Sequence, residues 1–104
     1  MVGLRGDRLG AGDRRAILAD HFGSVTFIVT TTVGVQGIRT VADAVQSLAS
    51  TQVTGGVRFF VAANQEGGEI QSLQGPGFSR IPTAVDQGRM PIATLESNAV
   101  TWGR

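Results

Sequence analysis

Asn64, Glu66 and the pair Gly67-Gly68 are the residues of this 104-residue chain whose types and spacing best fit ligand chemistry. The amide of Asn64 can donate and accept hydrogen bonds, and the carboxylate of Glu66 can accept them. The two glycines permit a tight turn or a close approach of the backbone to a bound molecule. This set suits a hydroxyl-rich ligand, and the alternative interpretation is a tight turn with solvated polar side chains.

The elements before Asn64 predict where these residues lie. Segments 24–30 and 57–63 are rich in β-branched and aromatic residues, which indicates buried strands, and residues 1–4 look like the end of another strand. The apolar spacing predicts a helix over 38–51 and a shorter one over 14–21. The order is βαβαβ, so we expect an α/β fold with a parallel sheet and right-handed crossovers.

Ligands bind at the carboxyl ends of the strands in such a sheet. Asn64 follows the strand at 57–63, and the threonines 30–32 follow the strand at 24–30, so both are expected at the carboxyl edge of the sheet, where they would line the same opening. Residues 64–88 show no sustained period, which predicts a long irregular connection of the kind that is usually functional. Apolar spacing from Ile92 to Trp102 then predicts a third helix that is still running at Arg104.

Composition excludes several classes of function. Apolar residues make up 41% of the chain and the net charge is only +1, so neither a nucleic acid nor an anionic membrane is an expected partner. There is no cysteine for a disulfide or a zinc site, and no cofactor or metal is expected. No apolar run is long enough for a transmembrane helix, and the first residues lack the apolar core of a signal peptide.

Residues 59–82, FFVAANQEGGEIQSLQGPGFSRIP, resemble the hallmark segment of glycoside hydrolase family 3. The resemblance is closest to the β-N-acetylhexosaminidase branch, whose pattern is an apolar strand, Asp-x-Glu-Gly-Gly-x-Val and a Phe-x-x-x-Pro turn. Residues 22–27 and 99–103 fit the neighbouring units of that branch, so the resemblance covers nearly the whole chain.

The resemblance implies that residues 1–104 are part of a (β/α)8 TIM barrel, roughly its first three units, truncated at both ends. Enzymes of this branch remove terminal β-N-acetylglucosamine from glycans with retention, using an aspartate nucleophile and a histidine–aspartate acid/base pair. Those catalytic groups lie beyond the equivalent of position 104, so no catalytic residue is expected in this chain and the chain alone is expected to be inactive. A carbohydrate is the implied partner, and the parent protein is expected to be secreted or in the cell envelope.

The resemblance also implies a substrate-binding set of Asn64, Glu66, Gly67 and Gly68, with one departure. The aspartate that binds sugar hydroxyls in the family aligns with Asn64, and an arginine common in this branch aligns with Ser72. An amide loses the charge-assisted part of that contact. A non-catalytic carbohydrate-binding relative or a remnant is therefore the alternative. A nucleotide-binding module is disfavoured, since the segment 10–15 lacks the third glycine of the dinucleotide fingerprint.

Two further side chains have structural and functional interpretations. His21 is expected to complete the C-terminal turn of the helix at 14–21, and Trp102 to contribute packing more than sugar stacking. A barrel fragment also leaves part of its sheet uncovered, so the fragment is expected to self-associate. The residues expected to be exposed there are Phe27, Val29, Phe59, Phe60 and Val61.

Overall fold

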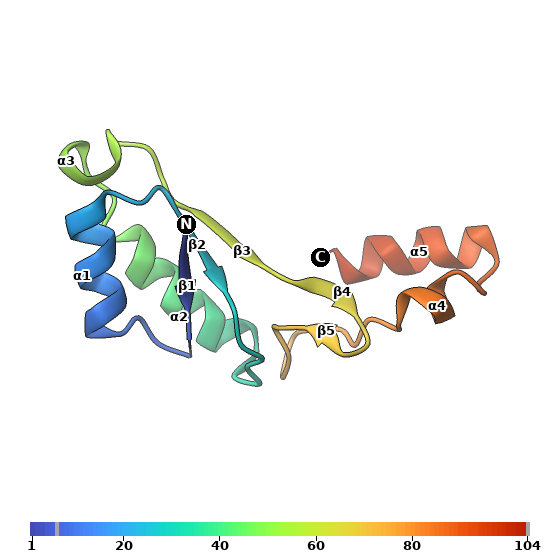
Figure 1. Cartoon of the computed structure of the whole chain (residues 1–104). Coiled ribbons are helices and arrows are strands. Elements are labelled where there is room, and N and C mark those ends of the chain that lie inside the picture. The colour runs from blue at the N-terminus through green and yellow to red at the C-terminus, as the bar shows by residue number, and fades with distance from the viewer. Residues whose placement is uncertain (6, 104) are drawn as a thin grey trace.

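The computed structural model describes residues 1–5 and 7–103. Its N-terminal part is a three-stranded parallel sheet in the order β1-β2-β3, formed by β1 (Val2–Leu4), β2 (Ser24–Phe27) and β3 (Phe60–Ala63) (Figure 1). Helix α1 (Ala11–Asp20) connects β1 to β2, and α2 (Gly34–Gln46) with the short α3 (Thr51–Thr54) connects β2 to β3. The predicted βαβαβ order and parallel sheet are confirmed.

The hydrophobic core lies between one face of this sheet and the helices α1 and α2. Both crossovers step in the same direction across the sheet, so right-handed connections place both helices on the same face. The predicted apolar face of α2 is confirmed, because Val41 and Val45 are buried there. The buried apolar side chains are Leu4, Ile17, Val25, Phe27, Ile38, Val41, Val45, Leu48 and Phe59.

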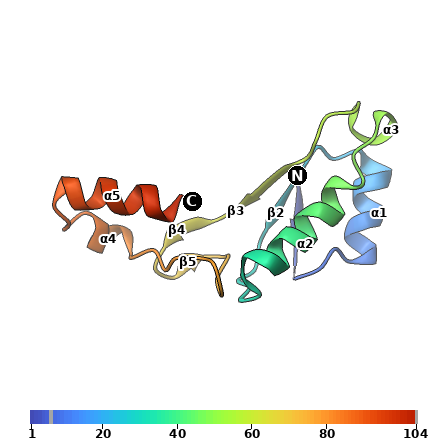
Figure 2. The ribbon, with the colours of Figure 1, turned by 180° about the vertical axis from the view of Figure 1, so that it is seen from behind.

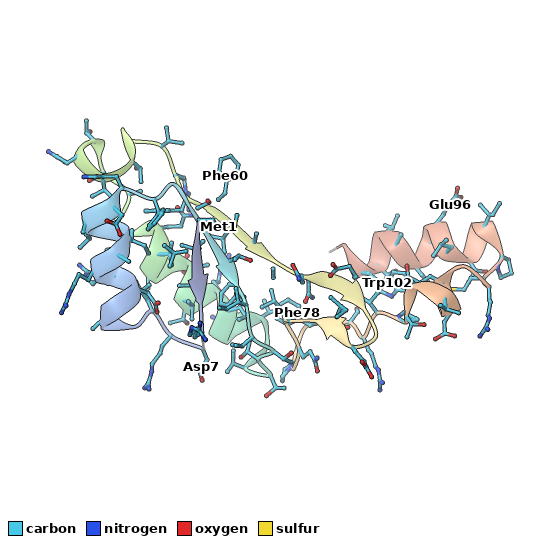
Figure 3. All side chains as sticks on the ribbon, in the orientation of Figure 1. Met1, Asp7, Phe60, Phe78, Glu96 and Trp102 are labelled. Carbon is cyan, nitrogen blue, oxygen red and sulfur yellow. The ribbon has the colours of Figure 1, made fainter. Side chains whose placement is uncertain are left out.

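The other face of the sheet carries no layer of its own in the described part of the chain. Phe60 of β3, labelled in Figure 3, points away from the helices. It is 76% exposed, and Ile28, directly after β2, is 48% exposed. The prediction of a buried strand over 57–63 is therefore wrong in its bounds and its burial. A continuous apolar run indicates burial on both faces only where both faces are covered.

The predicted exposures are confirmed for two residues and wrong for two. Phe60 and Val61 are exposed, whereas Phe27 and Phe59 are 2% and 5% exposed because they face the helices. Val29 is half-buried.

The prediction of a connection without secondary structure over 64–88 is wrong. Strands β4 (Gln65–Gly67) and β5 (Ile70–Gln71) form an antiparallel hairpin, and a short helix α4 (Ala84–Gln87) follows. These elements are only two to four residues long, so they leave no period in the sequence. Helix α5 (Ile92–Trp102) ends at its C-cap Gly103, and the predicted continuation to Arg104 lies outside the described residues.

The bounds of α2 and β2 also differ from the predicted ones, and contacts between distant segments explain the start of α2. Helix α2 begins four residues before the predicted start at 38, because the amides of Gly34 and Val35 donate to the carbonyls of Gln74 and Pro76 (3.0 and 2.9 Å). Its last turn ends at Gln46 and not at 51, and strand β2 ends at Phe27 and not at 30.

The ends of α1 follow from local contacts. The helix begins at Ala11, before the predicted start at 14, and the Asp13 carboxylate accepts a hydrogen bond from the Gly10 amide (3.1 Å). His21 follows the helix in the left-handed conformation (φ 53°), which confirms its predicted place at the C-terminal turn.

The molecule is elongated, with extents of 49 × 24 × 21 Å. Figures 1 and 2 show α4 and α5 at the opposite end from the α/β layer, joined to it by β3 and the hairpin. The radius of gyration is 15.8 Å, whereas a compact domain of this length has about 13 Å. Helix α5 buries no residue. Helices α4 and α5 therefore add no side chain to the core of the α/β layer, whereas Leu73 and Phe78 of the loop before them pack against it.

Candidate functional site

Asn64 leaves β3 at the carboxyl edge of the sheet, as predicted. Leu4, Phe27 and Ala63 are paired in register across the three strands, so Arg5, Ile28 and Asn64 follow at equivalent positions. With neighbouring strands about 4.8 Å apart, the backbones at Arg5 and Asn64 are about 10 Å apart. The Asn64 side chain is exposed and makes no hydrogen bond with the described residues.

The threonines that follow β2 reach this edge as well. The Thr31 amide donates to the Ser72 carbonyl (2.8 Å), and the Ser72 amide donates to the Asn64 carbonyl (2.8 Å). Ser72 therefore lies between the extension of β2 and the end of β3. Thr31 is buried, whereas Thr30 and Thr32 are exposed.

Local packing explains why positions 67 and 68 of the hairpin are glycines. Both have positive φ values, 102° at Gly67 and 61° at Gly68. A Cβ atom at Gly67 would overlap the Pro82 carbonyl oxygen, and one at Gly68 would lie 2.7 Å from Thr83 Cγ2. The Gly68 amide also donates to the Ile81 carbonyl (2.8 Å). The close backbone approach expected at these glycines is thus made, within this chain, by residues 81–83.

Two glutamines, neither of them a predicted site residue, hold the loop after the hairpin in place. The Gln65 side chain accepts from the Leu73 amide (2.7 Å) and donates to the Leu73 carbonyl (3.2 Å). The buried Gln71 side chain donates to the Ser79 carbonyl (2.8 Å) and accepts from the Ile81 amide (3.0 Å). The two side-chain amides thus hydrogen-bond to the backbone of Leu73 and of residues 79–81 and attach this loop to β4 and β5.

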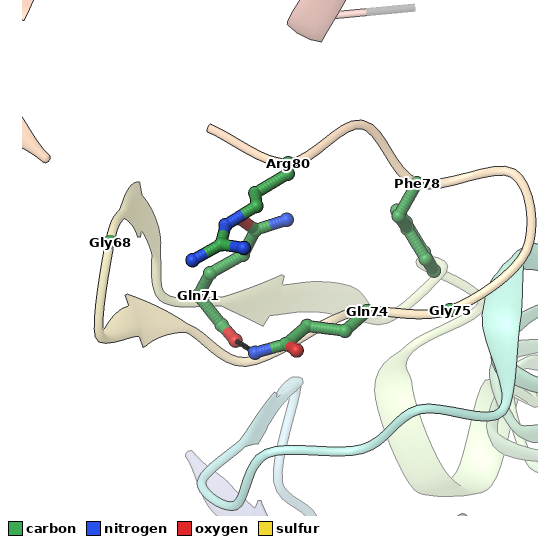
Figure 4. A pocket seen from close by; sticks show the side chains of 6 residues that line it. All are labelled: Gly68, Gln71, Gln74, Gly75, Phe78 and Arg80. Atoms are coloured by element: carbon green, nitrogen blue, oxygen red, sulfur yellow. Dashed lines mark hydrogen bonds between the residues drawn. The ribbon is translucent and has the colours of Figure 1, made fainter. Parts of the chain in front are cut away.

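A cavity of about 400 Å³ lies within this loop. Arg80 and Phe78 border it on the loop side and Gln71 on the hairpin side (Figure 4). Of the predicted site residues, only Gly68 lines it. The Glu66 side chain is exposed on β4 and lies outside this lining. The remaining lining residues are Gln74 and Gly75.

A second cavity, of about 320 Å³, lies at the carboxyl ends of β1 and β2. Arg5 and Asp7 line it together with residues 29–33. Neither charged residue was a predicted site residue. The signal for them was their place after the first strand: Arg5 has the same relation to β1 as Asn64 has to β3, and Asp7 follows two positions later.

A third cavity, of about 310 Å³, separates α5 from the loop that follows the hairpin. Trp102 is half-buried and borders this cavity opposite Phe78 and Ile81. The predicted packing role of Trp102 is thus only partly realised, since its side chain is half-buried and lines a cavity.

Within the part of the chain that the structure describes, no group of three metal-ligating His, Asp or Glu side chains occurs. The ion pair found there, Arg89 with Asp86 (3.5 Å), is exposed and lies on and just after α4. None of the described helices has the length and apolar character needed to cross a membrane.

The fold and the sequence of this chain are similar to those of a solved enzyme structure. The chain is similar to the crystal structure of a β-N-acetylhexosaminidase from Beutenbergia cavernae, with a TM-score of 0.93 and 42% sequence identity. The similarity covers 99% of this chain and 30% of that enzyme, of which it matches the N-terminal part. The resemblance to the β-N-acetylhexosaminidase branch is therefore confirmed. No family model and no curated protein matches the chain.

Proposed function

We propose that this chain is part of the catalytic barrel of a family 3 glycoside hydrolase that removes terminal β-N-acetylglucosamine from glycans with retention. The observation that carries the proposal is the 42% identity and 0.93 TM-score over 99% of the chain. In this proposal residues 1–104 make up roughly the first three βα units of a (β/α)8 barrel.

The uncovered face of the sheet supports the barrel. Parallel sheets are normally buried on both faces, yet α1 and α2 cover only one. In a closed barrel the second face is the interior, and side chains such as Phe60 and Ile28 fill it against other strands. The order β1-β2-β3 also leaves β1 and β3 with one unpaired edge each, where further strands of a barrel would add.

The residues of this chain would bind substrate and would not carry out bond cleavage. Asn64 at the carboxyl edge would hydrogen-bond sugar hydroxyls, and Glu66 would form the polar wall beside it, with Gly67 and Gly68 shaping the turn. Retaining hydrolysis needs a nucleophilic carboxylate about 5 Å from the acid/base group. In the proposed enzyme that pair is supplied by segments outside this chain.

The chain by itself is expected to show no turnover of an aryl β-N-acetylglucosaminide. A chimera tests the proposal directly: this chain replaces the matching N-terminal part of the Beutenbergia cavernae enzyme, which provides the remaining segments. We expect the chimera to hydrolyse the substrate and to release the β-anomer first. A folded chimera without activity contradicts the proposal, and turnover by the isolated chain contradicts the assignment of the catalytic groups to other segments.

Changing Asn64 to Asp in the chimera is expected to lower KM for the aryl β-N-acetylglucosaminide about tenfold. A carboxylate restores the charge-assisted hydrogen bond to sugar hydroxyls that an amide forms more weakly, a difference of about 1–2 kcal/mol. Asn98→Asp on α5 is the matched control, because it makes the same change of charge far from the sheet edge. An unchanged or raised KM in Asn64→Asp, measured beside the control, contradicts a role for Asn64 in sugar binding.

A non-catalytic carbohydrate-binding protein is the second candidate, favoured by Asn64 and Ser72 in place of the charged residues of the family pattern. It predicts a chimera that folds and binds N-acetylglucosamine but stays inactive until Asn64→Asp and Ser72→Arg are both introduced.

A further inference from the structure

Arg5 and Asp7 share a sheet edge with Asn64, although 57 positions separate Asp7 from Asn64 in the chain. The register Leu4↔Phe27 and Phe27↔Ala63 places the residue after each strand at one level. Residues at one level of a parallel sheet point to the same face. Leu4 and Phe27 face the helices, so the next position of each strand belongs to the uncovered face.

The cavity at this edge has the composition of a site for hydroxyl-rich ligands. Its lining combines the Arg5 guanidinium, the Asp7 carboxylate and the hydroxyls of Thr30–Thr32. A guanidinium only donates hydrogen bonds, an ionised carboxylate only accepts them, and a hydroxyl does both. Vicinal sugar hydroxyls need both kinds of partner, and a volume of about 320 Å³ lies within the range of small-molecule sites.

The two charged groups are not engaged with each other. Among the described residues the ion pair found is Arg89–Asp86, at the far end of the molecule, and no side-chain hydrogen bond is formed by Arg5 or Asp7. A structural ion pair between Arg5 and Asp7 therefore does not explain their place in the cavity. Both side chains are exposed and can contact a ligand at the carboxyl edge.

We propose that Arg5 and Asp7 extend the sugar-binding wall from Asn64 across the edge of β2 to β1, with Asp7 supplying the charged hydrogen-bond acceptor that position 64 lacks. The inference rests on the proposed function and names two further binding residues for it. Asp7 accepts hydrogen bonds from ligand hydroxyls, and Arg5 donates to a ring or hydroxyl oxygen. Thr31 follows β2, between the ends of β1 and β3, and its backbone is held there by hydrogen bonds with Ser72 and Gln74.

The test is a titration of the 104-residue chain with N-acetylglucosamine, followed by ¹H–¹⁵N NMR at a protein concentration at which light scattering detects no association. We expect the amide signals of Arg5, Asp7 and Thr30–Thr32 to shift together with that of Asn64. Asp7→Asn is expected to weaken the affinity about tenfold, the effect of losing one charge-assisted hydrogen bond. Asp20→Asn, an exposed carboxylate at the end of α1, is the matched control and is expected to leave the affinity unchanged.

A compensating variant distinguishes a shared site from a structural effect. If Asp7 replaces the missing charge at position 64, then Asn64→Asp restores the affinity of the Asp7→Asn chain. Dispersed spectra of each variant verify folding. Shifts confined to Asn64 and the hairpin, with Asp7→Asn behaving like the control, overturn this inference and leave the proposed function standing. A wild-type chain that shows no shift at any of these residues, together with an inactive chimera, overturns both.

Discussion

The purified chain is expected to self-associate and to bind the dye ANS strongly. Its exposed apolar side chains include Phe60 at 76% and Ile92 at 76% exposure, together with Val57, Val85 and Val100 above half. Covering each of these side chains contributes about 1.5–3 kcal/mol of favourable free energy. A few such contacts equal the stability of a small domain, so association is strongly favoured.

Strand edges add to this tendency. Within residues 1–5 and 7–103, strands β1 and β3 each have one edge without a partner, and Phe60 and Val61 lie on β3. Unpaired edges with apolar side chains are templates for pairing with another chain. Association is therefore expected to begin at β3.

Light scattering and ANS fluorescence measure the effect. A double variant, Phe60→Lys with Val61→Thr, places a charge on the uncovered face of β3 and a hydroxyl on its opposite face, both next to the unpaired edge, and is expected to lower both signals. Val57→Thr, just before the strand, is the control for lost apolar surface outside the pairing edge. A monodisperse wild-type monomer without an ANS signal contradicts the prediction, and it also removes the uncovered face as support for a barrel.

The α/β order could be predicted because its signals are local. The β-branched run around Val25 and the spacing of Val41 and Val45 each specify their element within a few residues. Apolar residues alone do not tell whether a second layer covers a strand, and for this reason the burial of β3 was predicted wrongly. The boundaries of α2 could not be predicted, because Gln74 and Pro76 determine its first turn from forty positions away.

Some residues of the candidate site could likewise be predicted from local patterns, and others could not. Asn64 was predicted because it follows a strand with a strong pattern, and the Glu-Gly-Gly motif beside it is specific. Arg5 and Asp7 follow β1, whose three residues give almost no signal of their own. The supporting role of Gln71 could not be predicted, because a buried amide is recognised only by the backbone groups that surround it.

Replacing Gln71 by Ala is expected to release the loop that borders the site. The Gln71 side chain is 4% exposed and satisfies the Ser79 carbonyl and the Ile81 amide. Its loss leaves both backbone groups without this partner and removes the link between β5 and the loop, at a cost of about 1–2 kcal/mol for each of the two part-buried hydrogen bonds.

The rate of hydrogen exchange at the Ile81 amide measures the stability of this loop alone, without requiring two-state unfolding of the whole chain. We expect exchange in Gln71→Ala to be faster by about 30-fold or more, the factor that corresponds to 2 kcal/mol. The Gly68 amide, which donates to the Ile81 carbonyl (2.8 Å), is expected to lose protection together with it.

Gln71→Glu separates the two contacts of the amide. A carboxylate can still accept from the Ile81 amide but cannot donate to the Ser79 carbonyl. We therefore expect protection at Ile81 to be largely retained, while the segment around Ser79 exchanges faster. Gln52→Ala on α3, an exposed glutamine, is the control. Equal protection of Ile81 in Gln71→Ala and in the control contradicts the bridging role of Gln71, because the loop would then be held by its backbone contacts alone.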